Sequence, residues 1–94
     1  MNLVILDGEK ITSKEQLHRH LAWSLDLPEW YGNNLDALYD CLCEMPPCRV
    51  IFVNAYIMEQ PGNYGQALLD TFFDAAESNP GLVISVKREE KEND

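Results

Sequence analysis

The sequence has few positive charges: 7 Lys and Arg stand against 16 Asp and Glu, which gives a formal net charge of −9. Direct binding to nucleic acid or to an anionic membrane depends on Lys and Arg contacts, so this balance disfavours both classes of partner. An acidic surface instead attracts a basic protein and speeds the encounter with it. Charge alone leaves open a simpler alternative, in which the acidity only keeps the protein in solution.

Long apolar runs are also missing from the sequence. The apolar run near the N-terminus covers only residues 3–6 and has no basic segment ahead of it, which excludes the usual pattern of a signal peptide. No stretch approaches the ~20 apolar residues that span a membrane. We therefore expect a cytoplasmic protein without a membrane segment.

The sequence contains three cysteines, Cys41, Cys43 and Cys48. An odd number without a secretion signal favours reduced thiols. Two residues apart on a helix, Cys41 and Cys43 point about 200° away from each other, which disfavours a disulfide between them. The CxxC spacing of many zinc sites is absent. We expect no metal, no cofactor and no catalytic cysteine.

The length of 94 residues is typical of one domain. Short apolar runs predict strands at 3–6, 49–54 and 82–87, and helical spacing predicts helices at 14–25, from Asn33 or Asn34 to Glu44 or Met45, and at 64–78. Alternating strands and helices predict an α/β fold, with a three-stranded, mostly parallel sheet packed against three or four helices.

Three local features refine this fold. Two overlapping capping-box patterns precede the first helix, Thr12 with Glu15 and Ser13 with Gln16. The continuous apolar run in 50–53 indicates a strand buried on both faces. Segment 55–65 fits no element well, although one turn of helix at 56–58 would supply a fourth helix. We expect a single domain over 1–87 and a charged, flexible tail over 88–94.

The second predicted helix has two different sides. At about 100° per residue, four apolar residues fall within an arc of about 80°, namely Leu35, Leu38, Leu42 and Met45. The opposite side carries Asp36, Tyr39, Asp40 and Cys43. We expect the apolar arc to contact the core, which leaves Tyr39 in solvent beside two carboxylates. Like charges four residues apart repel by roughly 0.2–0.5 kcal/mol, so this side is not arranged for stability.

The segment before this helix adds two aromatic residues, Trp30 and Tyr31, next to the flexible Gly32. Each feature has a simpler interpretation, since an acidic pair is commonly a solvated surface and aromatic residues in a loop commonly anchor the core. Tyr and Trp are, however, enriched at the hot spots of protein interfaces. Three aromatic residues and two carboxylates within eleven residues predict a protein-binding patch.

The stretch LPEWYGNNLDALYDCL (27–42) closely resembles the signature of the barstar family, the intracellular protein inhibitors of small secreted ribonucleases such as barnase. The stretch LDGEKITSKEQLHRHLAWSLDLPEWYG (6–32) is similar to the family's strand–turn–helix opening. The similarity is strong over 7–43 and weak over 55–70, and it extends to about residue 87. It implies a three-stranded parallel sheet packed on helices.

The resemblance also implies a mechanism, in which the second helix and the loop before it plug the active site of a ribonuclease. Asp40 would take the place of an RNA phosphate among the enzyme's Arg, Lys and His side chains, and Asp36 would add a second charged contact. Trp30 and Tyr39 would pack around that contact. The resemblance further places at the interface Tyr31, Gly32, Asn34, Cys43 and, on the last helix, Asp74.

The sequence departs from the family pattern at several of these positions. Trp30 and Tyr39 stand where the best-known member has tyrosine and tryptophan, respectively. The acidic contact on the last helix fits Asp74 better than Glu77. After Cys43, the family's small and aromatic residues give way to Glu44-Met45-Pro46-Pro47. These differences affect the edge of the interface and therefore the identity of the partner.

Two other functions compete with inhibition as interpretations of the sequence. A glycosidase needs two carboxyl groups about 5–9.5 Å apart across a cleft, whereas Asp36 and Asp40 would share one convex helix surface. His18 and His20 would face nearly opposite ways, and His18 is better interpreted as a hydrogen-bonded, partly buried histidine. We therefore expect no enzyme. The remaining alternative is an acidic module of the same fold that binds another basic protein. In either case we expect a monomer in the absence of the partner.

Overall fold

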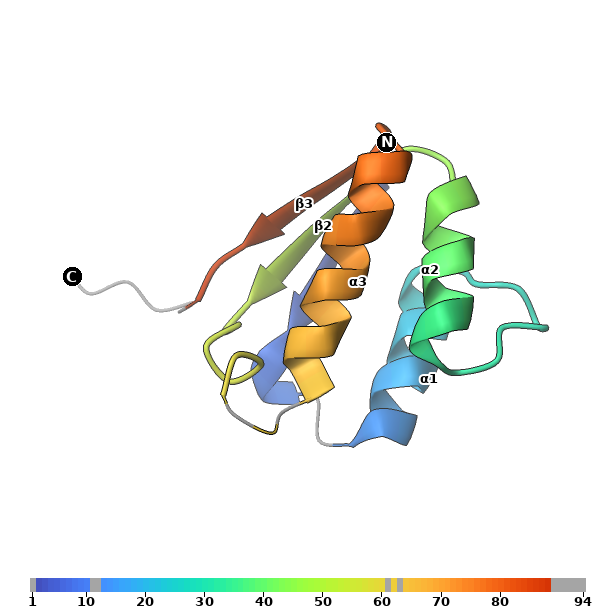
Figure 1. Cartoon of the computed structure of the whole chain (residues 1–94). Coiled ribbons are helices and arrows are strands. Elements are labelled where there is room, and N and C mark those ends of the chain that lie inside the picture. Colours follow the sequence, from blue (N-terminus) through green and yellow to red (C-terminus); the bar gives the residue numbers. More distant parts are fainter. Residues whose placement is uncertain (1, 11–12, 61, 63, 89–94) are drawn as a thin grey trace.

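A three-stranded parallel sheet forms one layer of the protein (Figure 1). The computed structural model describes residues 2–10, 13–60, 62 and 64–88. The strands are β1 (Asn2–Asp7), β2 (Cys48–Val53) and β3 (Leu82–Val86), in the order β1-β2-β3. Val4 pairs with Val50, and Val50 pairs with Ile84. The predicted parallel sheet is therefore confirmed.

Three α-helices accompany the sheet: α1 (Lys14–Ser24), α2 (Leu35–Glu44) and α3 (Tyr64–Ser78). The Ser13 hydroxyl accepts a hydrogen bond from Gln16 N (3.1 Å) and begins α1, as one of the two capping-box patterns predicts. The other pattern involves Thr12, which lies outside the described residues. Asn34 rather than Asn33 caps α2, since its side-chain oxygen accepts from Ala37 N (2.8 Å).

Two short segments differ from a simple strand–helix alternation. A 3-10 turn, η1 (Gly8–Lys10), follows β1 at the Asp7-Gly8 pair, which is a turn signal in the sequence. The stretch after β2 forms turns closed by hydrogen bonds such as Met58 N to Ala55 O (2.9 Å). The described residues therefore contain three α-helices, and the helical turn considered for 56–58 is not an α-helix.

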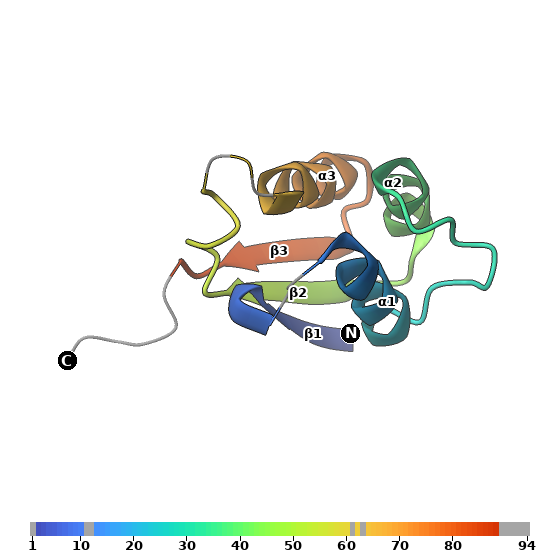
Figure 2. The same cartoon turned by 90° about the horizontal axis from the view of Figure 1, so that it is seen from below.

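All three helices lie on the same side of the sheet, as Figure 2 shows. The core lies between the two layers. From the sheet it receives Leu6, Val50, Phe52 and Leu82; from the helices it receives Leu17, Leu21, Leu38, Leu42, Leu68, Leu69 and Phe72. Phe52 and Phe72 meet edge to face, with ring centroids 5.0 Å apart. Full burial of each such side chain contributes about 1.5–3 kcal/mol.

The other side of the sheet is partly exposed to solvent. Along β2, Cys48, Val50 and Phe52 are buried while Arg49 is exposed and Ile51 is half-buried. The prediction that this strand is buried on both faces was therefore wrong. The physical reason is that the helices cover one face, which a continuous apolar run cannot reveal. Leu3 and Ile5 on β1 are 59% and 57% exposed.

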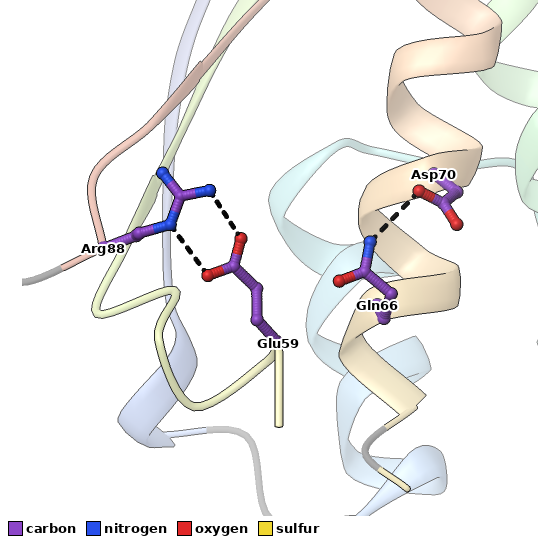
Figure 3. A network of polar contacts seen from close by, with 4 residues as sticks. All are labelled: Glu59, Gln66, Asp70 and Arg88. Atoms are coloured by element: carbon purple, nitrogen blue, oxygen red, sulfur yellow. Dashed lines mark hydrogen bonds and ion pairs between the residues drawn. The ribbon is translucent and has the colours of Figure 1, made fainter. Parts of the chain in front are cut away.

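The end of the described chain is attached to the turn after β2. Arg88 donates two hydrogen bonds to the Glu59 carboxylate, each 2.9 Å long (Figure 3). The same close-up shows Gln66 donating to Asp70 along α3 (3.2 Å). Residues 89–94 of the expected tail lie outside the described part of the chain.

Within the described part, no helix has the length and apolar character needed to cross a membrane.

Candidate protein-binding site

Helix α2 presents one side to the core and the other to solvent. Leu38 and Leu42 are fully buried, and Leu35 and Met45 are partly buried against the core. Asp36 and Asp40 on the opposite side are exposed. The orientation predicted from the apolar spacing is therefore confirmed. It places the two aspartates in solvent on a convex surface.

Among the described residues, no cation forms a salt bridge with either aspartate. Four residues apart on one helix, Asp36 and Asp40 are neighbours on its surface. In the described residues, the one salt bridge joins Arg88 to Glu59 and involves neither of them. The negative charge of α2 is thus available to a partner that supplies positive charge.

Tyr39 lies between this acidic surface and α3. It is half-buried, and its hydroxyl lies 3.3 Å from Ser78 Oγ at the end of α3. The expectation that Tyr39 stands fully in solvent was wrong, because α3 packs alongside α2 and takes up one side of the ring. Tyr39 therefore forms a fixed border of the exposed surface.

The contact between Tyr39 and Ser78 also places Asp74. Asp74 is exposed and lies four residues before Ser78, so the two residues share one side of α3. Glu77 is adjacent to Ser78 in sequence and points about 100° away from it. Helical spacing thus places Asp74, and not Glu77, on the side of α3 that carries Ser78; the role of Asp74 as the third acidic residue of the surface stays a prediction.

The loop before α2 separates the two aromatic residues that the sequence treated as a pair. Trp30 is 71% exposed, whereas Tyr31 is only 7% exposed. Tyr31 therefore matches the simpler interpretation, a core anchor, and its ring is not free to contact a partner. Gly32 and Asn34 are exposed, and the Gly32 carbonyl accepts a hydrogen bond from Asn34 Nδ2 (3.2 Å).

A buried histidine holds Tyr31 in place. His18 Nδ1 hydrogen-bonds the Tyr31 hydroxyl, and His18 Nε2 lies 3.0 Å from the Tyr64 hydroxyl on α3. Burial, and then the nearby Lys14 charge, lower the pKa of His18, which favours the neutral ring. Burial raises the pKa of Tyr31. The interpretation of His18 as a hydrogen-bonded structural residue is confirmed, and His20 on the other side of α1 is exposed.

The cysteines have no disulfide in this structure. Cys41 and Cys48 are buried, and Cys43 is partly buried at the edge of the acidic surface. Burial, followed by the charges of Asp40 and Glu44, raises the pKa of the Cys41 thiol and makes it a poor nucleophile. Among the described residues, no group of three His, Cys, Asp or Glu side chains is placed to hold a metal ion.

We refer to Asp36, Asp40 and Asp74 together with Trp30 and Tyr39 as the acidic patch. Trp30 approaches α2 from the loop side, where it lines a cleft together with Cys41 and Glu44. Tyr39 and Asp74 border the α3 side. Sequence reasoning missed Ser78 and Tyr64, the residues of α3 that fix Tyr39 and His18. No local pattern could indicate them, because each contact joins residues 39 or more positions apart.

The chain is similar to known proteins of one family. The family model described as "Barstar (barnase inhibitor)" matches residues 1–92. A Bacillus subtilis (strain 168) protein named "Putative ribonuclease inhibitor YrdF" is 36% identical over 84 aligned residues, which cover 82% of this chain and 88% of that protein.

Proposed function

The chain belongs to the barstar family, and from this premise we propose that it is an intracellular inhibitor of a small, basic ribonuclease. The observation that carries the proposal is the position of Asp36 and Asp40. They are exposed, adjacent and without a salt bridge among the described residues, on a helix whose other side is fixed in the core.

In the proposed mechanism, α2 and residues 29–34 enter the active site of the ribonuclease. That site must hold an RNA phosphate, so it carries Arg, Lys or His side chains. Carboxylates bind such groups through short, charge-assisted hydrogen bonds, which are bidentate with arginine. Asp40 takes the central position of the phosphate, and Asp36 forms a second charged contact. The convex surface of α2 suits a concave partner.

The residues around the aspartates have different roles in this proposal. Trp30 packs against the enzyme through its exposed ring, and Tyr39 through the edge that α3 leaves open. Tyr31 contributes to binding indirectly, because its buried ring anchors the loop that carries Trp30. Asp74 extends the negative surface onto α3. The border is completed by Gly32, Asn34 and Cys43.

The charge of the whole protein supports the same encounter. A net charge of −9 accelerates association with a basic enzyme and opposes binding to RNA. Repulsion between copies also favours a monomer in the absence of the partner. Because the aspartates are exposed, added salt screens their attraction over about 10 Å at 0.1 M and should weaken inhibition.

The test is a titration of the protein into a panel of small microbial ribonucleases, with RNA cleavage as the readout. We expect stoichiometric inhibition of at least one enzyme, weakened at least 100-fold by Asp40→Ala. Asp70→Ala, which removes an equal charge from an exposed position on α3, is the matched control and should keep inhibition within about threefold.

Two results would contradict the proposal. Inhibition that is indifferent to Asp40 would remove the phosphate-like role of this residue. Failure to inhibit any enzyme in the panel, combined with binding of a basic protein that is not a ribonuclease, would favour the alternative of an acidic interaction module. That alternative depends on the unusual stretch Glu44–Pro47 at the edge of the patch and on the exchanged aromatic residues Trp30 and Tyr39.

A further inference from the structure

A cleft of about 290 Å³ opens next to the acidic patch, between α2 and the loop that follows α1. Leu25, Leu27 and Trp30 contribute from the loop, and Cys41 and Met45 contribute from α2 and its end. Most of the lining is therefore apolar. The residues of the cleft that carry charge are Asp26 and Glu44, and neither Lys, Arg nor His lines it among the described residues.

The cleft is continuous with the surface that carries Asp40. Glu44 lies four residues after Asp40 and is its neighbour on the surface of α2. Cys41, next to Asp40 in sequence, lies on the wall of the cleft and is 8% exposed. Glu44 itself lines the cleft, so the cleft opens beside the helix surface that carries Asp40. A partner bound over Asp40 therefore also covers the opening of the cleft.

The shape and charge of the cleft favour one kind of occupant. Its volume is at the lower end of the roughly 300–1,000 Å³ of small-molecule sites, so it suits a single long side chain better than a complete ligand. Apolar walls accommodate the methylene stem of Arg or Lys, while Asp26 and Glu44 attract the charged head. Trp30, 71% exposed, offers a ring face for a cation–π contact.

We propose that this cleft is a second docking point, which receives an Arg or Lys side chain of the basic protein partner. The identity of the partner as a ribonuclease rests on the proposed function, whereas the preference of the cleft for a basic side chain does not. Glu44, Met45 and Pro46 line the cleft and belong to the stretch that departs from the family pattern. The cleft is therefore placed to determine which enzyme is bound.

The first test uses a small probe and needs no ribonuclease. N-acetyl-argininamide is titrated into the ¹⁵N-labelled protein, and N-acetyl-norleucinamide, a probe with an uncharged side chain, serves for comparison. The protein has two tryptophans, and Trp23 on α1 is 83% exposed, so its indole signal is an internal control.

We expect the Trp30 indole signal to shift and saturate with the arginine probe at about millimolar affinity, while the Trp23 signal stays in place. Glu44→Gln should weaken this binding at least twofold. Equal shifts with the norleucine probe would assign the cleft to apolar side chains, and no selective shift at Trp30 would exclude the docking point. Either result would overturn the inference.

The second test uses a ribonuclease that the protein inhibits. Trp30→Leu should raise the dissociation constant about tenfold and Glu44→Gln about three- to tenfold, because each removes part of the contact with the basic side chain. Trp23→Leu and Glu15→Gln, at exposed positions on α1, are the matched controls and should change the dissociation constant less than twofold.

Full inhibition by both cleft variants would contradict the inference while leaving the proposed function intact. If the protein inhibits no ribonuclease in the panel, the proposed function is contradicted, and the probe titration alone decides on the cleft.

Discussion

The apolar and acidic sides of α2 share ten residues but follow opposite physical requirements. Leu38 and Leu42 are fully buried and gain stability from lost contact with water. Asp36 and Asp40, on the other side, repel each other and are not paired within the described residues. Burial of the apolar side holds the helix in place, so the fold tolerates repulsion on the acidic side, which the proposed partner would relieve.

Leu42→Ala removes a buried side chain from the apolar side of α2 and should have the largest effect on the stability of the fold. Removal of a fully buried leucine side chain leaves a cavity and costs about 2–5 kcal/mol in the free energy of unfolding. Urea denaturation followed by circular dichroism measures this loss. Asp36→Asn on the same helix should change the free energy of unfolding by less than about 1 kcal/mol. Equal losses for the two variants would show that the two sides do not differ as described.

Tyr31→Phe tests the link between the core and the exposed loop. The substitution removes the hydroxyl that bonds His18 Nδ1 and leaves a buried polar atom without its partner, which should cost about 1–3 kcal/mol. Thermal unfolding measures the change. Tyr56→Phe, which removes a hydroxyl that donates to the exposed Glu9, is the matched control and should cost less. An effect of Tyr31→Phe no larger than that control would exclude an anchoring role.

The same buried histidine predicts a dependence of stability on pH. The pKa of His18 is lowered in the folded protein, so the unfolded state takes up a proton first as the pH falls. The stability that the neutral ring provides is complete above the unfolded pKa of about 6.5 and is lost as the pH falls through the lower folded pKa. Urea denaturation at pH 7.5 and 5.5 should show a decrease that His18→Gln abolishes and His20→Gln, at an exposed position, preserves. Retention of the decrease in His18→Gln would assign it to other groups.

The sequence predicted the parts of the molecule that depend on local periodicity. The positions of the three strands and three helices, and the two sides of α2, follow from apolar spacing and helix capping. The same spacing could not show that the helices cover one face of the sheet, because an apolar strand such as 50–53 looks the same in either case. The short segment η1 after β1 has no such spacing, and Asp7-Gly8 indicates a turn there but not its 3-10 form.

The candidate site was predictable where it lies on the helix and less so where it depends on distant contacts. Trp30 and Tyr31 are adjacent in a loop, and no period tells which one is buried. Buried Tyr31 forms a hydrogen bond with His18 on α1, and half-buried Tyr39 packs against the core and contacts Ser78 on α3. Such pairings arise from the packing of α1 and α3 and leave no local pattern.

Asp40→Asn tests the central claim most directly, because it removes the charge while keeping the size of the side chain. Its stability and its inhibition of a susceptible ribonuclease should be measured on the same preparation. We predict a free energy of unfolding that is unchanged or raised by about 0.2–0.5 kcal/mol, since repulsion from Asp36 and Glu44 is relieved. The same variant should inhibit at least 100-fold more weakly. A loss of stability together with full inhibition would contradict the account.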